Sequence, residues 1–188
     1  MNDMTQECEE VVWQPLQRLG AQASSSSWRY RDGGGVTSAQ GFRASGIHAG
    51  FRADPNRLDM ALVVADEPCA CAAVFTKNVF CSAPVLVSKQ HLEDRGYGCG
   101  RAVVINSGNA NAATGTPGLV AAEDTAVLVG EIVGCPAQEV LVASTGVIGQ
   151  QLDISPFETG LPQAVQQLSL EGGSLAARAI MTTDTVSK

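Results

Sequence analysis

A short apolar run that ends in small polar residues is the feature that most constrains the fold of this chain. Residues 140–149 read VLVASTGVIG, in which four apolar, mostly β-prone residues run directly into Ser144-Thr145-Gly146. Such a run predicts a buried strand whose carboxyl end presents a hydroxyl and a bare backbone N–H. Those groups are the donors of an oxyanion hole, although Ser-Thr-Gly after a strand is more often an ordinary turn.

The clearest helix lies just before this strand. Thr116 is a good N-cap, Pro117 suits the first helical position, and Gly134 supplies the stop. Apolar residues recur between these limits at helical spacing. The pattern predicts a helix from about residue 117 to residue 133.

Other short elements complete the expected domain. Strands are expected at 58–65, 70–76, 85–87 and 102–105, the first two joined as a hairpin by a tight turn at 66–68. Helices are expected at 88–94, 155–161, 163–168 and 175–180, with Pro162 separating the middle pair. Strands first and helices interleaved later predict an α/β fold, a layered α/β sandwich with a mixed sheet.

Composition divides the chain into two parts. Residues 1–35 contain an acidic start, the run SSSS at 24–27 and the run GGG at 33–35. Polar and glycine-rich segments bury too little surface to offset the entropy of ordering. We therefore expect a flexible N-terminal extension at 1–35 and one folded domain at 36–188.

Charge excludes several classes of partner. The net charge is −7 and the isoelectric point is about 4.7, so a basic face for nucleic acid or for an anionic membrane is not expected. The N-terminus is acidic where a targeting peptide is basic, and no apolar stretch approaches the roughly 20 residues that span a bilayer. We expect a cytoplasmic protein with small-molecule or protein partners.

Common cofactor and metal motifs are missing from the sequence. It has no P-loop, and Gly96-Tyr97-Gly98-Cys99-Gly100 precedes a strand, whereas a dinucleotide fingerprint follows one. The six cysteines show no CxxC spacing and are expected to be reduced thiols, with no metal site. His48 and His91, the two histidines, are expected to be solvated rather than catalytic.

Small hydroxyl and amide residues remain as candidates for a site. They gather at the ends of predicted elements, in 106–111, 144–146 and 182–185. Together they could bind a carboxylate, an amide or a developing oxyanion. Each group alone is also explained by turn and cap chemistry.

Six blocks of this sequence resemble, in order and spacing, the N-terminal part of a known family, the bifunctional ornithine acetyltransferases of arginine biosynthesis (the ArgJ family). The blocks are GFRASGIHAG (41–50), RLDMAL (57–62), AVFTKN with APV (73–78 and 83–85), NSGNANA (106–112), STGVIG (144–149) and AIMTTDT (179–185). The resemblance covers roughly residues 36–188. It implies the incomplete α-chain domain of the self-cleaving ornithine acetyltransferase and DmpA-like fold.

The resemblance also implies a reaction. Family precursors cut themselves before a threonine, and this new N-terminal threonine of the β chain takes an acetyl group from N-acetylornithine and passes it to glutamate. Carried over by position, Thr145 and Gly146 match the oxyanion hole, and Thr182 matches a substrate-binding threonine. No cofactor or metal is implied, although some members accept acetyl-CoA as acetyl donor.

The resemblance further implies an αβ heterodimer with the β chain, which oligomerises further. The family continues through a Gly-Met-Ala-Lys-Gly segment to an Ala-Thr cleavage pair, and this sequence ends at Lys188 before both. We therefore expect a truncated α chain that lacks the nucleophile and is inactive alone. Two alternatives stay open: a self-cleaving aminopeptidase of the related fold, and a non-catalytic scaffold domain.

Overall fold

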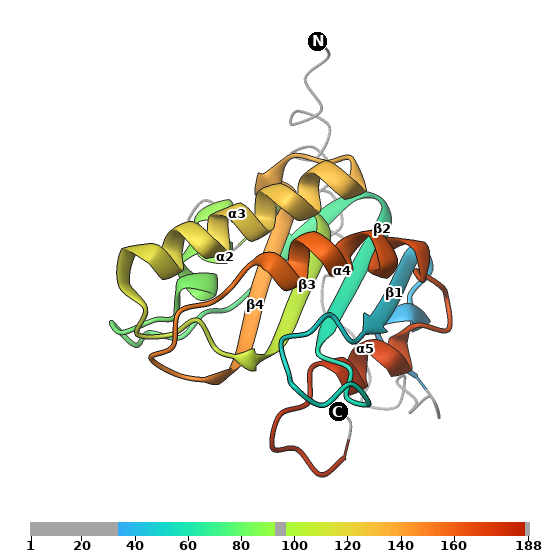
Figure 1. The fold of residues 1–188 in the computed structure, drawn as a ribbon. Helices are drawn as coiled ribbons and strands as arrows, with labels where there is room; N and C mark the ends of the chain where they lie inside the picture. The colour runs from blue at the N-terminus through green and yellow to red at the C-terminus, as the bar shows by residue number, and fades with distance from the viewer. Residues whose placement is uncertain (1–33, 93–96, 187–188) are drawn as a thin grey trace, which may run out of the picture.

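The computed structural model describes residues 34–92 and 97–186 and is built on one mixed sheet (Figure 1). Four strands lie in the order β1-β2-β3-β4: β1 (Phe42–Ile47), β2 (Met60–Ala72), β3 (Tyr97–Asn109) and β4 (Val140–Val147). β1 pairs with β2 and β2 with β3 in antiparallel fashion, whereas β3 and β4 are parallel. The predicted mixed sheet is confirmed.

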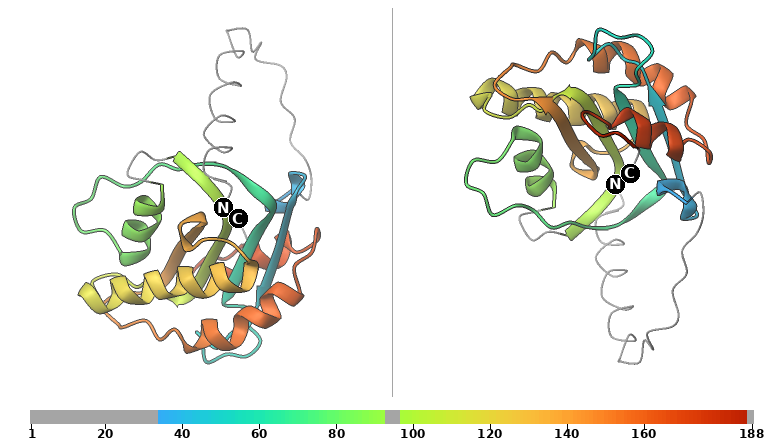
Figure 2. Two further views of the ribbon diagram at one scale, coloured as in Figure 1. Left: turned by 90° about the horizontal axis from the view of Figure 1, so that it is seen from above. Right: turned by 90° about the horizontal axis from the view of Figure 1, so that it is seen from below.

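Helices cover both faces of this sheet (Figure 2). Helices α3 (Gly115–Val133) and α4 (Ser155–Gln166) lie on one face, over a core that includes Met60, Leu62, Val104 and Phe157. Helix α5 (Gly173–Ala179) packs on the opposite face of β1 and β2, and α2 (Ala83–His91) lies beside β4. Two short 3-10 helices, η1 (Val36–Ser38) and η2 (Ala137–Glu139), complete the elements. This is the layered α/β arrangement that the element pattern predicts.

The contact between α5 and the sheet depends on very small residues. Its core consists of Ala44, Ala61, Ala176 and Ala179. A side chain at Gly46 of β1 would overlap the backbone carbonyl of Leu175. The helix therefore lies almost directly on the strand backbone.

The predicted end of helix α3 is confirmed, whereas its predicted N-cap is wrong. The helix begins at Gly115, two residues before the expected start, and Thr114 rather than Thr116 is its N-cap. It ends at Val133, with Gly134 as the C-cap. Gly134 has φ +80, the left-handed conformation that glycine adopts without steric cost. Helix α4 continues through Pro162, so the expected division at this residue is wrong.

The hairpin expected at 58–76 is also wrong. Residues 60–72 form the single strand β2, and both of its halves pair with β3. The pairing shifts between Val64 and Cys69, which lie opposite Ala102 and Gly100. The turn-like residues Asp66, Glu67 and Pro68 therefore form a bulge in one strand, because a bulge takes up residues that cannot join the ladder.

Helix α2 replaces the strand expected at 85–87. Pro84 lies in the first helical turn, where its missing N–H costs nothing, and Ser82 is the N-cap. Ser88, at the expected start of the helix predicted at 88–94, lies within α2 instead. Its hydroxyl donates to the carbonyl of Val142 (2.8 Å) and accepts from the Val142 amide (3.0 Å), so α2 covers the edge of β4.

Several further expectations have mixed outcomes. β1 was not expected as a strand, and β3 extends beyond both ends of the strand expected at 102–105. Four cysteines are free, namely Cys69, Cys71, Cys81 and Cys135. Cys99 is disulfide-bonded, so the expectation of reduced thiols is wrong there.

Two expectations lie partly outside the described residues: most of the extension expected at 1–35, and the end of the helix expected at 88–94. Within those residues no helix is long and apolar enough to span a membrane.

A close backbone contact fixes the parallel pairing of β3 and β4. Gly108 lies opposite Gly146, and both have positive φ angles, +123 and +138. A Cβ at Gly146 would overlap the Gly108 carbonyl and lie 2.6 Å from the Asn109 nitrogen. Only glycine fits at this point of contact.

Replacing Gly146 by alanine tests this constraint. We expect Gly146→Ala to lower the free energy of unfolding by at least about 3 kcal/mol, because steric overlap adds to an unfavourable φ. Gly134→Ala is the matched control, since Gly134 also has a positive φ but open space around its Cβ position; it should cost only about 1 kcal/mol. Urea titration of both variants measures the difference, and equal losses would contradict the close contact.

Candidate active site

Thr145 and Gly146 lie at the carboxyl end of β4, where the sequence analysis places them. Thr145 is half-buried and pairs with Ser107 of β3, and Gly146 is exposed. Side chains alternate along a strand, so Val142 faces the core under α3 and α4, whereas Thr145 faces the side of the sheet that carries α5. No hydrogen bond of the Thr145 hydroxyl is found within residues 34–92 and 97–186.

The asparagines of NSGNANA have a structural role. Asn111 is fully buried and donates to the Gly118 carbonyl (2.8 Å), and its oxygen accepts from the Thr114 hydroxyl (2.8 Å). The Asn106 amide nitrogen donates to the Asn109 carbonyl (3.0 Å). These bonds agree with the turn-and-cap interpretation for Asn111 and for the side-chain nitrogen of Asn106, whereas the buried Oδ1 of Asn106 has no hydrogen-bond partner among the described residues.

Asn109 links the end of β3 to the loop after β4. Asn109 donates from its side-chain nitrogen to the carbonyls of Gln150 and Gln151, each at 3.1 Å. The Gly149 amide donates to the Ala112 carbonyl (2.8 Å). These bonds hold the chain just after Thr145 and Gly146, and the pairing of β4 with β3 holds it before them.

Thr182 reaches the same end of the sheet by another route. It follows α5, is half-buried, and its amide donates to an Asp184 carboxylate oxygen (3.3 Å). Ser107, the partner of Thr145 in the sheet, donates its hydroxyl to the Ala179 carbonyl at the end of α5 (2.7 Å). Figure 1 shows the segment after α5 at the end of the sheet where β3 and β4 finish. The structure thus places the three predicted site residues at one end of the sheet.

Two arginines at this end were missed by the sequence analysis. Arg52 donates from Nη2 to the Met181 carbonyl (2.8 Å) and from Nε to the Ser107 hydroxyl (3.2 Å), and Arg57 donates to the Thr182 carbonyl (3.1 Å). Burial, together with the positive charge of Arg57, lowers the pKa of Arg52, and the negative charge of Asp59 opposes this effect. Arg57 lies in the block RLDMAL, so its presence in that block was the available signal.

Both histidines are bonded, which corrects the expectation that they are solvated. His48 Nδ1 lies 2.9 Å from the Arg57 carbonyl and 3.2 Å from a carboxylate oxygen of Asp59. His91 Nδ1 lies 2.7 Å from the Val140 carbonyl at the edge of β4. Both contacts stabilise the backbone, in line with a non-catalytic role.

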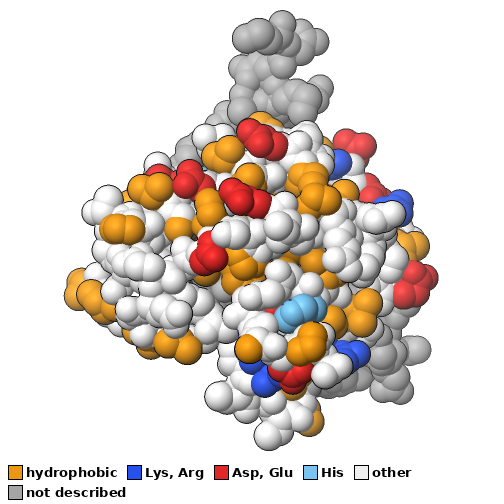
Figure 3. Space-filling view, in the orientation of Figure 1, with side chains coloured by type: hydrophobic (Ala, Val, Ile, Leu, Met, Phe, Trp, Pro, Cys, Tyr) orange, Lys and Arg blue, Asp and Glu red, His pale blue; other side chains and the backbone are white. Residues whose placement is uncertain are grey.

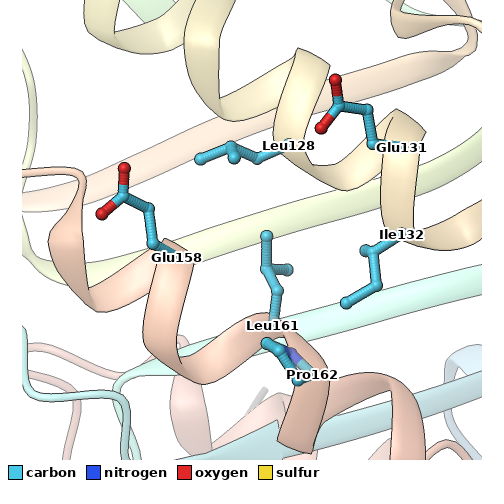
Figure 4. A pocket seen from close by; sticks show the side chains of 6 residues that line it. All are labelled: Leu128, Glu131, Ile132, Glu158, Leu161 and Pro162. Atoms are coloured by element: carbon cyan, nitrogen blue, oxygen red, sulfur yellow. The ribbon is translucent and has the colours of Figure 1, made fainter.

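The groove between α3 and α4 lies on the other face of the sheet (Figure 4). It is an open hollow of about 280 Å³ with an apolar floor and two glutamates at its rim; its lining residues are Leu128, Glu131, Ile132, Glu158, Leu161 and Pro162. Acidic side chains are spread over this helical face in Figure 3. Among the described residues, no group of three or more acidic, histidine or cysteine side chains could hold a metal ion.

Comparison with known proteins identifies relatives of this chain. The profile of the ArgJ family matches residues 43–188. The arginine biosynthesis bifunctional protein ArgJ of Thermosynechococcus vestitus is 48% identical over 155 residues, which are 82% of this chain and 36% of the relative. The chloroplastic ArgJ protein of Zea mays is 45% identical over 157 residues, 82% of this chain and 33% of the relative. The chain therefore spans little more than a third of the length of these relatives.

Solved structures show the same fold. The ornithine acetyltransferase of Mycobacterium tuberculosis, solved in complex with ornithine, matches with a TM-score of 0.75 and 42% identity over 81% of each chain. The ArgJ protein of Bacillus halodurans matches with a TM-score of 0.72 and 38% identity, over 81% of this chain and 78% of that one. The family profile, the sequence identity to these relatives and the shared fold agree: this chain belongs to the ArgJ family.

Proposed function

We propose that this chain supplies the oxyanion-binding half of an acetyltransferase that moves an acetyl group from N-acetylornithine to glutamate in arginine biosynthesis. Family membership over residues 43–188 is the observation that carries the proposal. Two named relatives support it, the bifunctional ArgJ proteins of arginine biosynthesis and an ornithine acetyltransferase solved with ornithine.

The attacking group in this proposal belongs to a β chain made by self-cleavage of the same precursor. The β chain's N-terminal threonine attacks the acetyl carbonyl through its hydroxyl oxygen, and the carbonyl oxygen takes up the negative charge. The C–N bond then breaks, and ornithine leaves with its amine protonated. Glutamate's amine attacks the acetyl-threonine in the reverse sense and regenerates the hydroxyl.

Thr145 and Gly146 stabilise the charged oxygen in this scheme. The Thr145 hydroxyl and the Gly146 amide are donors at a strand end that is held by its pairing with β3 and by hydrogen bonds of the following residues, Gly149 and Gln150. Donors that are already in position need no rearrangement when charge develops, which is the basis of their effect on rate. The exposure of Gly146 supports access by an acyl oxygen.

Thr182 binds the amino-acid part of the substrate in the same proposal. The β chain completes the site as an αβ heterodimer, which assembles into a larger oligomer. No bound cofactor is required, and acetyl-CoA is a second acetyl donor to be tested beside N-acetylornithine.

Removal of the Thr145 hydroxyl tests the proposal directly. The chain is co-expressed with a β chain of the family, and acetyl transfer from N-acetylornithine to glutamate is measured. We expect Thr145→Ala to lower kcat by about 10²- to 10³-fold, the usual effect of losing one oxyanion donor. Thr116→Ala, at an exposed threonine in the first turn of α3, is the control and should leave kcat unchanged.

Two results would contradict the proposal. One is wild-type kcat in Thr145→Ala. The other is hydrolysis of amino-acid amides by the wild-type complex without transfer to glutamate, which is the outcome expected of an aminopeptidase.

Substitution of Thr182 separates substrate binding from chemistry. We expect Thr182→Val, which keeps the side-chain shape but lacks the hydroxyl, to raise KM for N-acetylornithine about tenfold and to change kcat less. Steady-state kinetics of the same co-expressed complex measure both constants. Thr183→Val, at the exposed neighbouring threonine, serves as control, and an unchanged KM in Thr182→Val would remove Thr182 from the binding site.

A further inference from the structure

The segment after α5 is held from one side by two guanidinium groups. Arg52 donates to the carbonyl of Met181 and Arg57 to the carbonyl of Thr182, at 2.8 and 3.1 Å. Arg52 and Met181 are 129 positions apart in the sequence, and Arg57 and Thr182 are 125 positions apart. Met181 and Thr182 follow Ile180, the C-cap of α5, so their carbonyls lie outside the hydrogen-bond pattern of the helix. Hydrogen bonds from a charged donor such as a guanidinium group are among the stronger ones.

Asp59 fixes the loop that carries both arginines. Its carboxylate is fully buried and accepts hydrogen bonds from the backbone amides of Ala49 (2.6 Å), Gly50 (3.2 Å) and Arg52 (2.9 Å). His48 also contacts this carboxylate and the carbonyl of Arg57. The Arg52 side chain therefore starts from a backbone position that is set by a buried charge.

Ser107 connects this loop to the predicted oxyanion hole. Its hydroxyl oxygen accepts from Arg52 Nε and donates to the Ala179 carbonyl, and its backbone pairs with Thr145. One serine thus joins Arg52, the end of α5 and the strand that carries Thr145. The position of Thr182 relative to Thr145 depends on these bonds.

We infer that Arg52 and Arg57 are positioning residues that hold the Met181-Thr182 backbone against the end of β3, so that Thr182 meets the amino-acid substrate next to the oxyanion hole. The functional part of this inference rests on the proposed function. The structural part, that the guanidinium groups fix this segment, stands on the contacts alone. Neither arginine touches the reacting atoms in this account.

Hydrogen exchange tests the structural part on the chain itself. Arg52→Met keeps the apolar stem and removes every donor, and we expect the amides of residues 181–184 to exchange at least about tenfold faster, since hydrogen bonds from charged donors are among the stronger ones. Arg43→Met is the control, because Arg43 is an exposed residue near the start of β1 that pairs with Asp66. Amide-resolved NMR and a thermal melt of each variant separate this local change from global unfolding.

Kinetics of the co-expressed complex test the functional part. Arg52→Met should raise KM for N-acetylornithine about tenfold with a smaller change in kcat, the pattern of a weakened ground-state contact. Arg52→Lys should recover part of this loss, because an ammonium group can reach a carbonyl but cannot reproduce the simultaneous contacts of the guanidinium group with Ser107 and the Met181 carbonyl. Arg57→Met provides a second, independent variant at a more exposed site with an expected smaller rise in KM.

The outcomes separate this inference from the proposed function. If the wild-type complex transfers no acetyl group, the proposed function fails, and the exchange data still decide whether the arginines hold the segment. Unchanged exchange in Arg52→Met would overturn the inference. Faster exchange with an unchanged KM would also overturn it, because the contacts would then serve stability alone.

Discussion

The parallel pairing of β3 with β4 is the contact on which the site depends. Gly108 and Gly146 bring the two backbones so close that no side chain fits between them, and this places Ser107 beside Thr145. From Ser107, hydrogen bonds lead to Arg52 and to the end of α5. Loss of this pairing would separate Thr145 from Thr182 even if every other element kept its fold.

Two kinds of polar group work together around this contact. Asparagine side chains bind backbone groups of the loops after β3 and β4, and the buried carboxylate of Asp59 binds three amides of the loop after β1. A buried polar group that loses its hydrogen bonds is costly in free energy. Each loop is therefore stabilised in the conformation that satisfies these groups. Some of the polar residues that the sequence marks as candidate ligands therefore bond to the backbone of the neighbouring loops. Others lie at the exposed end of the sheet.

The elements that are determined by neighbouring residues could be predicted from the sequence. Gly134 marks the end of α3, Pro117 lies in its first turn, and the apolar run at residue 140 marks β4, because helix ends and buried strands are determined over a few residues. The predicted hairpin at residue 66 was wrong because both halves of β2 pair with β3, at residues that are 25 to 46 positions away in the sequence. β1 was missed because its arginine, serine and glycine lack a strand pattern, and its burial comes from tertiary contacts. Of the candidate site, Thr145, Gly146 and Thr182 were predicted from the resemblance, whereas the contacts of Arg52 and Ser107 exist only in the folded chain.

The bond between Ser88 and the edge of the sheet has a consequence of its own. A serine hydroxyl offers one donor and one acceptor, the same pair that a peptide group offers, and Ser88 presents both to Val142. At that position a single side chain imitates one residue of a neighbouring strand. A strand from another polypeptide could not pair with Val142, because its backbone amide and carbonyl are already hydrogen-bonded to Ser88. The edge of the sheet at β4 is therefore covered by a helix instead of a fifth strand.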